Sequence, residues 1–244
     1  MKLKEKRIVV TGGSKGLGRA LVTRFAAEGA KVAFCARNWD ELNRVALGLS
    51  VQGFSPVFAV CDVANPEQVE QFSETVHSEF DSVDVVINNA AILGSRGEIR
   101  EWTRSAWERV IDVNVNGPFL ITRAFLNRMI EQRRGLIVNV TSSVGKVGRA
   151  KWGAYAVSKF ALEGFTQTLA EEVQQFGIKV ISVNPGALNT EMRHQAYPDE
   201  DRSRLTDPSH IAEVFTDIIL HASRLKTGGS LDAQEYFKKN KELV

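Results

Sequence analysis

Six short, nearly continuous apolar runs recur along this chain, and a longer segment with helical periodicity separates each run from the next. The runs are rich in Val and Ile and lie at 7–11, 31–36, 56–61, 83–88, 135–141 and 179–184. Apolar runs of this kind are typical of a parallel sheet that is covered on both faces. Their alternation with helices predicts one α/β fold, a doubly wound parallel sheet with helices on both faces.

Capping patterns predict where several helices begin. Asn65 precedes Pro66, and a proline at the first helical position after a polar N-cap residue favours a helix start. Ser105 stands three residues before Glu108, which is a capping-box pattern and predicts a second start. A last long helix is expected near 208–222.

Composition is that of one soluble globular domain, and we expect it to span residues 1–244. The chain is 43% hydrophobic and 25% charged, and no linker or low-complexity tract divides it. A net charge of +2 does not indicate nucleic acid as a partner. No run approaches the roughly 18–20 apolar residues that cross a membrane. Cys35 and Cys61 lie in apolar runs, so we expect reduced thiols and a cytoplasmic location.

Two segments near the C-terminus depart from the regular alternation. Residues 186–206 follow the sixth strand and contain Gly186, Pro198 and many charges. Because ligands bind at the carboxyl ends of strands in open α/β sheets, this lid segment is predicted to cover a substrate. The alternative is a plain surface loop. Residues 233–244 are expected to form a polar tail that frays.

A glycine-rich loop, TGGSKGLGRA (11–20), joins the first strand to the first helix. Gly12, Gly16 and Gly18 let the backbone approach a diphosphate, to which the helix N-terminus offers free N–H groups. The spacing is neither G-x-G-x-x-G nor a Walker A loop. The loop therefore predicts a dinucleotide site, with an ordinary strand-to-helix turn as the alternative.

The end of the second strand indicates which dinucleotide is bound. An acidic residue at this point would hydrogen-bond the ribose 2′-hydroxyl of NAD, whereas an arginine accommodates the 2′-phosphate of NADP. The strand ends at Arg37 and Asn38, without a carboxylate, and Lys15 in the glycine loop adds a second cation. We therefore predict NADP(H), although Arg37 as a solvated loop charge remains an alternative.

YAVSK (155–159) places a phenol and an ammonium group one helical turn apart. A cation beside a phenol favours the phenolate, so Lys159 is expected to lower the pKa of Tyr155. The spacing alone also fits an ordinary surface pair.

The chain resembles the short-chain dehydrogenase/reductase family from about residue 6 to 228. The resemblance is carried by these motifs, in this order: TGGSKGLG (11–18), DV (62–63), NNAA (88–91), Asn114, Ser142, YAVSK (155–159), PG (185–186) and Thr190. It implies a single Rossmann-like domain. The spacing within YAVSK is similar to that of the members that reduce a carbonyl rather than a C=C bond.

The resemblance implies four catalytic residues. Tyr155 would donate a proton to the carbonyl oxygen, and Lys159 would tune Tyr155 and contact the nicotinamide ribose. Ser142 would hydrogen-bond the same oxygen, with Ser143 as the runner-up. Asn114 would hold a relay water through its carbonyl. Because Pro118 has no N–H to donate four residues back, that carbonyl is expected to be free.

The resemblance also implies a set of cofactor contacts. Asp62 would contact the adenine, and the backbone of Asn89 and Ala90 would lie along the cofactor. Thr190 would hydrogen-bond the nicotinamide carboxamide, beside Pro185. The predicted cofactor-binding residues are Gly12, Ser14, Lys15, Gly16, Leu17, Gly18, Arg37, Asp62, Val63, Asn89, Ala90, Tyr155, Lys159, Pro185, Gly186 and Thr190.

The substrate end and the C-terminus are less informative. Candidate pocket positions suggest an apolar or aromatic carbonyl compound: Leu93, Gly94, Val144, Trp152, Leu188, Met192 and Tyr197. Cations near the entry and the lid leave an anionic or carrier-linked substrate as an alternative, with solvated surface charge as the more common case: Arg149, Lys151, Arg193, Arg202 and Arg204. The four histidines are scattered, so no metal site is expected. After Gly228 the Asp-Gly-Gly of the family is missing, which leaves a homodimer or a homotetramer open. The default expectation is a homodimer through the long helices near 105–131 and 153–176.

Together these features predict an oxidoreductase that reduces a ketone or aldehyde to an alcohol with NADPH, with Tyr155 as the proton donor. Two alternatives remain. The first is an NAD-linked alcohol dehydrogenase, and the second is a non-catalytic NADP(H)-binding regulatory protein.

Overall fold

The computed structural model describes residues 2–241 and contains, within them, a seven-stranded sheet. The strand order is β3-β2-β1-β4-β5-β6-β7, and every neighbouring pair is parallel. The strands are β1 (Arg7–Thr11), β2 (Lys31–Ala36), β3 (Val57–Val60), β4 (Val85–Asn88), β5 (Gly135–Val140), β6 (Ile178–Asn184) and β7 (Ser230–Asp232). The six predicted strands are all present, with ends that differ by no more than two residues from those expected.

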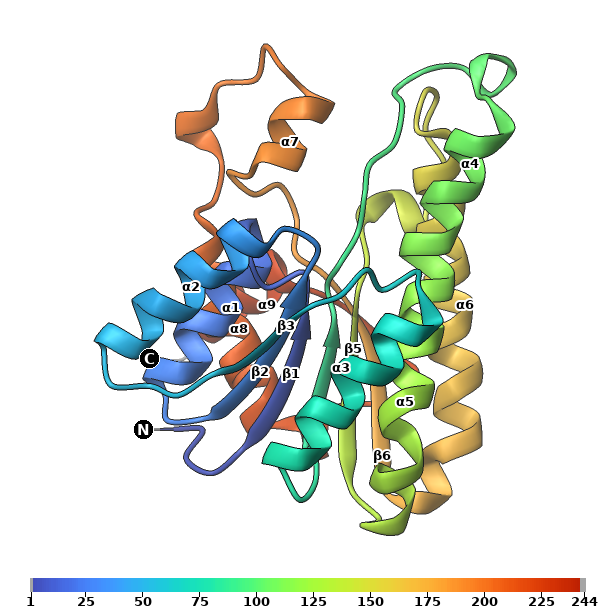
Figure 1. The fold of residues 1–244 in the computed structure, drawn as a ribbon. Coiled ribbons are helices and arrows are strands. Elements are labelled where there is room, and N and C mark those ends of the chain that lie inside the picture. The colour runs from blue at the N-terminus through green and yellow to red at the C-terminus, as the bar shows by residue number, and fades with distance from the viewer. Residues whose placement is uncertain (1, 242–244) are drawn as a thin grey trace.

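Helices cover both faces of the sheet (Figure 1). One layer consists of α1 (Gly16–Ala27), α2 (Trp39–Val51), α8 (Pro208–Leu220) and α9 (Ala233–Lys241). The other layer consists of α3 (Pro66–Glu79), α4 (Arg104–Ile111), α5 (Gly117–Glu131) and α6 (Gly153–Val173). The predicted doubly wound α/β fold is therefore confirmed.

The core is divided by the sheet into two apolar clusters. Ile8 and Val10 of β1 belong to the cluster under α1, α2 and α8, whereas Val9 between them belongs to the cluster under α3, α5 and α6. This alternation follows from the period of two in a strand. Because both faces are buried, the strand is apolar throughout, which is the pattern visible in the sequence.

The chain reverses its direction of winding between β1 and β4. From β1 the order runs through β2 to β3 on one side, and from β4 through β5 and β6 to β7 on the other. The loops that follow β1 and β4 therefore diverge at the carboxyl edge of the sheet. In an open α/β sheet this switch point is where a ligand binds.

Helix starts follow the capping patterns with one exception. Asn65 accepts a hydrogen bond from the N–H of Gln68, and α3 begins at Pro66 as predicted. The predicted start at Ser105 is wrong, because Thr103 is the N-cap residue of α4 and accepts from the N–H of Ala106. Thr103 and Ser105 both carry a hydroxyl group, so the residue type alone does not show which of them caps the helix.

The lid segment (186–206) is more regular than expected. It contains α7 (Glu191–Ala196) and a short 3₁₀ turn (Arg202–Arg204). Its two ends meet in a β-bridge between Leu188 and Thr206. Gln234 of α9 donates to the Ala187 carbonyl at 3.2 Å and to the Thr206 hydroxyl at 3.4 Å. Both ends of the lid segment are thus joined to α9.

The expectation of a frayed polar tail over 233–244 is wrong for residues 233–241, which form α9; residues 242–244 lie outside the described part. Asp232 caps this helix by accepting from the N–H groups of Gln234 and Glu235. Ala233 is fully buried in the core cluster under α8, and Tyr236 packs against it. Burial of these two side chains explains the order of a polar sequence.

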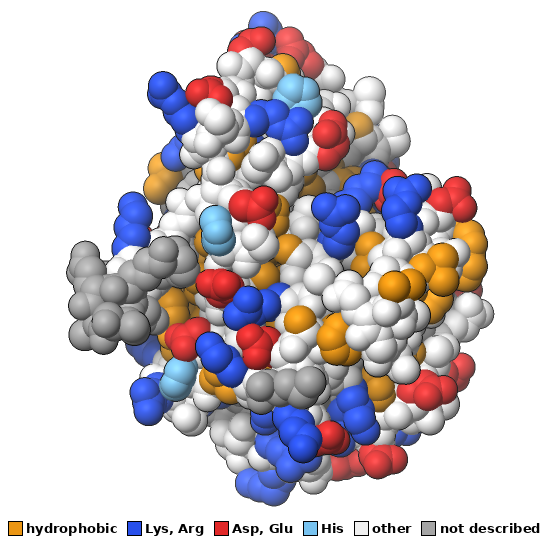
Figure 2. All heavy atoms as spheres, turned by 90° about the vertical axis from the view of Figure 1, so that its left-hand side faces the viewer, with side chains coloured by type: hydrophobic (Ala, Val, Ile, Leu, Met, Phe, Trp, Pro, Cys, Tyr) orange, Lys and Arg blue, Asp and Glu red, His pale blue; other side chains and the backbone are white. Residues whose placement is uncertain are grey.

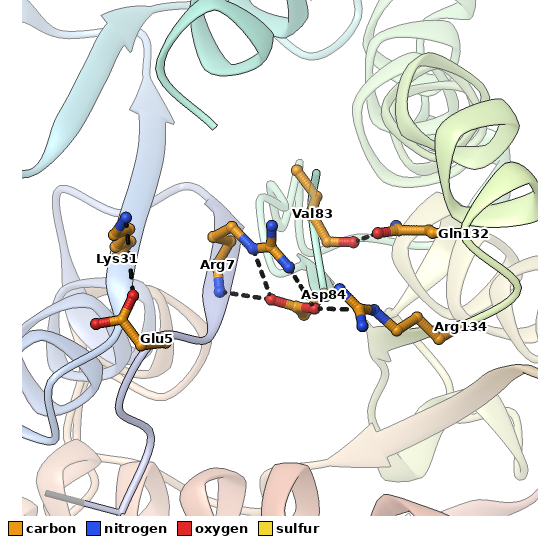
Figure 3. Close-up of polar contacts among 7 residues, drawn as sticks. All are labelled: Glu5, Arg7, Lys31, Val83, Asp84, Gln132 and Arg134. Carbon is orange, nitrogen blue, oxygen red and sulfur yellow. Dashed lines mark hydrogen bonds and ion pairs between the residues drawn. The ribbon is translucent and has the colours of Figure 1, made fainter. Parts of the chain in front are cut away.

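A charged cluster lies at the opposite edge of the sheet from the switch point (Figure 3). Asp84 accepts hydrogen bonds at 2.9 and 3.0 Å from the guanidinium of Arg7 and at 2.9 Å from its backbone N–H. Arg134 lies 3.6 Å from the other side of the same carboxylate, and Gln132 donates to the Val83 carbonyl. These contacts join the amino ends of β1, β4 and β5.

Charges of both signs interleave over most of the face that carries α1, α2 and α8 (Figure 2).

Cys35 and Cys61 are free and buried, as expected. Among residues 2–241, no helix combines the length and the apolar character that a membrane span requires.

Candidate active site

A cleft of about 820 Å³ opens at the carboxyl ends of β1, β2, β4, β5 and β6, between the glycine loop and the lid segment. This volume lies in the range of about 300–1,000 Å³ that is typical of small-molecule sites. All the predicted cofactor-binding residues line the cleft, and so do Ser142, Tyr155 and Lys159. Of the predicted catalytic and cofactor-binding residues, Asn114 alone is absent from this lining and is fully buried behind it. Of the candidate pocket positions, Val144 and Tyr197 are absent from the lining as well.

The glycine loop has a backbone that other residues would not allow. Gly12 has a φ of 68°, and a Cβ atom at Gly18 would lie 2.1 Å from the Gly12 carbonyl oxygen. Lys15, the N-cap residue of α1, makes no side-chain hydrogen bond to the helix. The first N–H groups of α1 therefore remain available to an anion. The loop has the form that a diphosphate requires.

Asn89 fastens this loop to the end of β4. Its amide donates to the carbonyls of Thr11 and Gly12 at 2.9 and 3.3 Å. The Thr11 hydroxyl in turn accepts from the N–H groups of Asn89 and Ala90 at 3.0 Å. These bonds hold the two loops of the switch point together. Asn88 points into the sheet instead and donates to Asn139 at 2.8 Å.

The two predicted phosphate cations differ in their surroundings. Arg37 lines the cleft after β2 as predicted. Lys15, however, forms an ion pair with Glu41, with 2.6 Å between Nζ and Oε1. Glu41 also lines the cleft, in the first turn of α2. Sequence reasoning found no carboxylate at the end of β2 and missed this one, which stands four residues farther along the chain.

Asp62 lines the cleft but is already engaged by a side chain from another element. Its carboxylate accepts from the guanidinium of Arg109 on α4 and from the N–H of Ala64 at 3.1 Å. Burial raises the pKa of Asp62 and is the largest single effect, but the hydrogen bonds from Arg109 and Ala64 and the charge of Arg109 together leave the pKa below its ordinary value. The carboxylate is therefore held in a defined orientation beside Val63.

Tyr155 and Lys159 project from the first two turns of α6. The Lys159 amine lies 5.6 Å from the centroid of the Tyr155 ring and donates to the Val140 carbonyl at 2.8 Å. Lys159 is 3% exposed and Tyr155 is 8% exposed. The alternative of an ordinary surface pair is thus excluded by burial.

The expected lowering of the pKa of Tyr155 is wrong for this arrangement. Burial raises the pKa of Tyr155 to about 12, and a hydrogen bond with Ser142 opposes that rise. Burial likewise lowers the pKa of Lys159 to about 8, against the raising effect of Glu163. Desolvation disfavours the charged form of each group and is the largest effect on the pKa of both. Tyr155 is therefore kept as a proton-bearing phenol.

Ser142 lies two residues after the end of β5, close to Tyr155, whereas Ser143 is exposed. Both hydroxyls line the cleft, and the Ser142 hydroxyl lies near enough to the Tyr155 phenol to lower its pKa. Two adjacent hydroxyls can donate to one carbonyl oxygen. The preference for Ser142 over Ser143 agrees with this placement.

Asn114 lies in a widened helical turn. Residues Asp112–Asn116 form a π-helical turn between α4 and α5, in which the Gly117 N–H donates to the Asp112 carbonyl. Pro118 has no N–H, so it cannot donate to the Asn114 carbonyl. The role of that carbonyl in a water relay stays a prediction.

The Asn114 side chain has a task that the sequence did not indicate. Its amide donates to the Ile92 carbonyl at 2.9 Å and to the Ser158 hydroxyl at 3.0 Å, and its oxygen accepts from the Ile92 N–H. Ser158 donates to the Tyr155 carbonyl at 2.7 Å. Asn114 thus positions α6, which carries Tyr155, against the loop after β4.

The wall of the cleft beyond β6 is formed by the start of the lid segment. Asn184 accepts from the Gly186 N–H at 3.1 Å and donates to Asp232 at 2.7 Å. Gly186 has a φ of 77°. The Thr190 hydroxyl accepts a hydrogen bond from the Arg193 N–H at 3.3 Å and so caps the N-terminus of α7. The predicted contact with the nicotinamide carboxamide would be a second role for the same hydroxyl. Pro185, which stands between Asn184 and Gly186 in the chain, also lines the cleft.

An apolar and aromatic cluster surrounds Tyr155 at the far end of the cleft. Its buried members, with Met192 and Tyr197 packed against them, are Leu93, Val144, Trp152, Tyr155, Ala156 and Ala196. Arg96 covers this cluster from the loop after β4, and its donation to the Ala196 carbonyl at 2.9 Å reaches the lid segment. Arg96 was missed because an exposed arginine in a loop carries no signal in the sequence.

The residues present fit a dinucleotide. A glycine loop with uncapped helical N–H groups, a cation after β2 and a buried phenol follow one another along a single cleft. Residues 2–241 contain no group of three or more side chains that could hold a metal ion.

Comparison with known proteins agrees with this geometry. The family model for short chain dehydrogenases matches residues 6–201. The oxidoreductase YciK of Escherichia coli (strain K12) is 37% identical, over 95% of this chain and 93% of its own. The NADPH-dependent pterin aldehyde reductase of Arabidopsis thaliana is 32% identical, over 93% of this chain and 92% of its own.

Solved structures place the chain in the same group. A short chain dehydrogenase of Shigella flexneri complexed with NADP has a TM-score of 0.90 and 37% identity, over 95% of this chain and 98% of its own. One from Escherichia coli CFT073 complexed with NADPH has the same score and identity, over 95% and 97%. The predicted cofactor, NADP(H), agrees with the one in these two structures. The chain is a member of the short-chain dehydrogenase/reductase family.

Proposed function

We propose that this oxidoreductase reduces the carbonyl group of an apolar or aromatic ketone or aldehyde, with NADP(H) as its cofactor. The observation that carries the proposal is the burial of the Tyr155 phenol beside Lys159 and Ser142, at the end of a cleft that begins at the glycine loop. NADPH supplies the hydride. Every other task falls to side chains of this chain.

Tyr155 gives its proton to the carbonyl oxygen as negative charge develops there. A pKa of about 12 keeps the phenol protonated throughout the neutral range, which suits a proton donor. Ser142 donates a second hydrogen bond to the same oxygen. Lys159 contributes a positive charge 5.6 Å from the ring, which stabilises the phenolate left after transfer.

The substrate class follows from the cluster around Tyr155. Trp152, Leu93 and Met192 present apolar surface to the cleft, and such walls favour an apolar or aromatic group beside the carbonyl. The relative from Arabidopsis acts on a pterin aldehyde, a planar aromatic aldehyde, which supports this class.

The preference for NADP(H) is supported by Arg37 after β2 and by the cofactors of the two solved relatives. We propose that residues 1–244 form one domain. A cytoplasmic location stays a prediction.

The first test is calorimetric titration of the purified protein with NADPH and, separately, with NADH. We expect tight NADPH binding and binding of NADH that is weaker by about tenfold or more, because the 2′-phosphate gains a charge-assisted contact. Arg37→Ala should remove most of that difference. A preference for NADH would instead favour the NAD-linked alcohol dehydrogenase.

The second test uses Tyr155→Phe. Loss of the phenol should reduce turnover by about 10³-fold or more while NADPH binding changes little, because the ring is retained and the proton donor is lost. A wild-type protein that binds NADPH but turns over no carbonyl substrate would favour the non-catalytic regulatory protein.

A further inference from the structure

Glu163 is a buried carboxylate one helical turn beyond Lys159 on α6, and the mechanism above does not use it. Its side chain is 8% exposed. Buried carboxylates are rare in proteins unless a partner compensates their charge. Its presence in the core behind the catalytic lysine therefore calls for a physical reason.

Both oxygens of Glu163 accept hydrogen bonds from serine hydroxyls. Ser182 of β6, itself fully buried, donates to Oε2 at 2.7 Å, and Ser230 of β7 donates to Oε1 at 3.2 Å. A protonated carboxyl group would have to donate from one of its oxygens, whereas a carboxylate only accepts. The arrangement therefore fits an ionised side chain that is held from two strands.

Lys159 stands one helical turn before Glu163 on α6, and among the lysines and arginines whose burial the structure describes it alone is buried. Burial lowers the pKa of Lys159 to about 8, and the charge of Glu163 raises it against that effect. Without Glu163, a larger fraction of the amine would be neutral near pH 7. A neutral amine would give the phenolate of Tyr155 no electrostatic support.

Other charged groups on the elements around α6 are less suited to this task. Those on α4, in the π-helical turn, after the 3₁₀ turn at Ser143–Gly145 and on β6 are at least partly exposed: Arg104, Glu108, Arg109, Asp112, Lys146 and Lys179. Asp232 of β7 is engaged by the Asn184 amide at 2.7 Å. On α6 itself, Glu171 and Glu172 are exposed.

We propose that Glu163 is a positioning residue that holds Lys159 in its ammonium form beside Tyr155, with Ser182 and Ser230 fixing Glu163 for this task. The inference rests on the proposed function of Tyr155 and Lys159. It extends the catalytic centre to β7, in the part of the chain where the sequence departs from the family pattern.

The test follows the titration of Lys159 directly, so it needs no substrate. Lysine side chains labelled with ¹³C are observed by NMR in the free protein between about pH 6 and pH 11, which brackets the ordinary lysine pKa of about 10.4. The Lys159 signal is assigned by its loss in Lys159→Arg. Glu163→Gln keeps the shape and hydrogen-bonding capacity of the side chain and removes its charge.

We expect the titration midpoint of Lys159 to fall by about one pH unit in Glu163→Gln, because the ammonium loses its counter-charge. Glu171→Gln makes the same charge change on an exposed turn of the same helix, and we expect it to leave the midpoint where it is in the wild type. An equal midpoint in the wild type and in Glu163→Gln would overturn the proposal and leave Glu163 as a purely structural residue.

Ser230→Ala provides a second variant should Glu163→Gln not fold. It releases one carboxylate oxygen, keeps the charge and should lower the midpoint by a smaller amount; an unchanged midpoint in Ser230→Ala would then overturn the proposal. With a carbonyl substrate, the alkaline limb of kcat/KM should move to lower pH in Glu163→Gln. A wild type with no reductase activity would refute the proposed function, while the NMR midpoints would still test Glu163.

Discussion

The guanidinium carbon of Arg96 lies 4.3 Å from the centroid of the Trp152 ring and 5.2 Å from that of Tyr197. Trp152 in turn lies 5.6 Å from the Tyr155 ring. Through its hydrogen bond to the Ala196 carbonyl, Arg96 also joins the loop after β4 to the lid segment. One exposed side chain thus joins the aromatic cluster beside Tyr155 to the lid segment.

Arg96→Ala should raise KM for the carbonyl substrate by about 3- to 10-fold, the amount expected for one cation–π contact and one hydrogen bond. The value of kcat should change less, because Tyr155 and Ser142 stay in place. Steady-state kinetics measure both. Arg100→Ala, an exposed neighbour paired with Glu98, is the matched control. A KM equal to that of the wild type would show that Arg96 does not hold the lid segment.

Glu41→Gln should increase the affinity for NADPH about two- to fivefold, because Lys15 loses its partner and becomes free for the 2′-phosphate. The affinity for NADH should not change, since that nucleotide lacks the phosphate. Calorimetry of both nucleotides gives the ratio. Asp40→Asn removes an exposed charge from the same turn and serves as the control. An equal gain for both nucleotides would contradict the pairing argument.

Asp84→Asn should reduce the free energy of unfolding by about 1–2 kcal/mol at pH 7, because the partly buried guanidinium of Arg7 then loses its counter-charge. Burial raises the pKa of Asp84, but the hydrogen bonds from Arg7 outweigh it and hold the pKa below its ordinary value. This contribution is therefore present above the unfolded pKa of about 3.9 and lost as the pH falls through the folded value.

Urea denaturation at several pH values measures this dependence. The difference between the wild type and Asp84→Asn should shrink as the solution becomes more acidic. Asp81→Asn, at an exposed position nearby, should cost much less at every pH. A difference that stays constant down to the lowest accessible pH would mean that Asp84 does not act through its charge.

Phe119 of α5 and Val157 and Phe160 of α6 are 47%, 44% and 45% exposed. Large apolar side chains that gather on neighbouring helices mark an interaction surface, and the predicted homodimer would cover them. Phe119→Arg combined with Phe160→Arg should convert the dimer to a monomer in light scattering after size exclusion. Leu47→Arg, on α2, should not. A wild type that is already monomeric would contradict the prediction.

Much of the fold could be predicted because the local pattern and the tertiary structure agree. The strands are apolar throughout since both faces are buried, and the Asn65-Pro66 start of α3 needs no distant partner. The polar α9 was missed because its order depends on Ala233 and Tyr236 packing against the core under α8. Its sequence alone resembles a frayed end.

In the site, residue types and spacings located the cleft but not its electrostatics. The sequence shows a lysine one turn from Tyr155, yet it does not show that both groups are buried deeply enough for desolvation to dominate. Glu41 lies 26 residues after Lys15, and only the meeting of α1 and α2 brings them to 2.6 Å. Contacts between distant segments of this kind have no local signature.

The charged cluster around Asp84 lies at the amino ends of the strands, whereas the phenol of Tyr155 lines the cleft at their carboxyl ends. In this parallel sheet, the residues that hold the strands together at their amino ends are thereby separated from the residues that line the ligand cleft at their carboxyl ends. Substitutions at Leu93, Arg96 or Met192 can remodel substrate choice while the anchoring edge stays intact. Such a chain is suited to directed evolution, and a library confined to those positions should retain folded clones at high frequency.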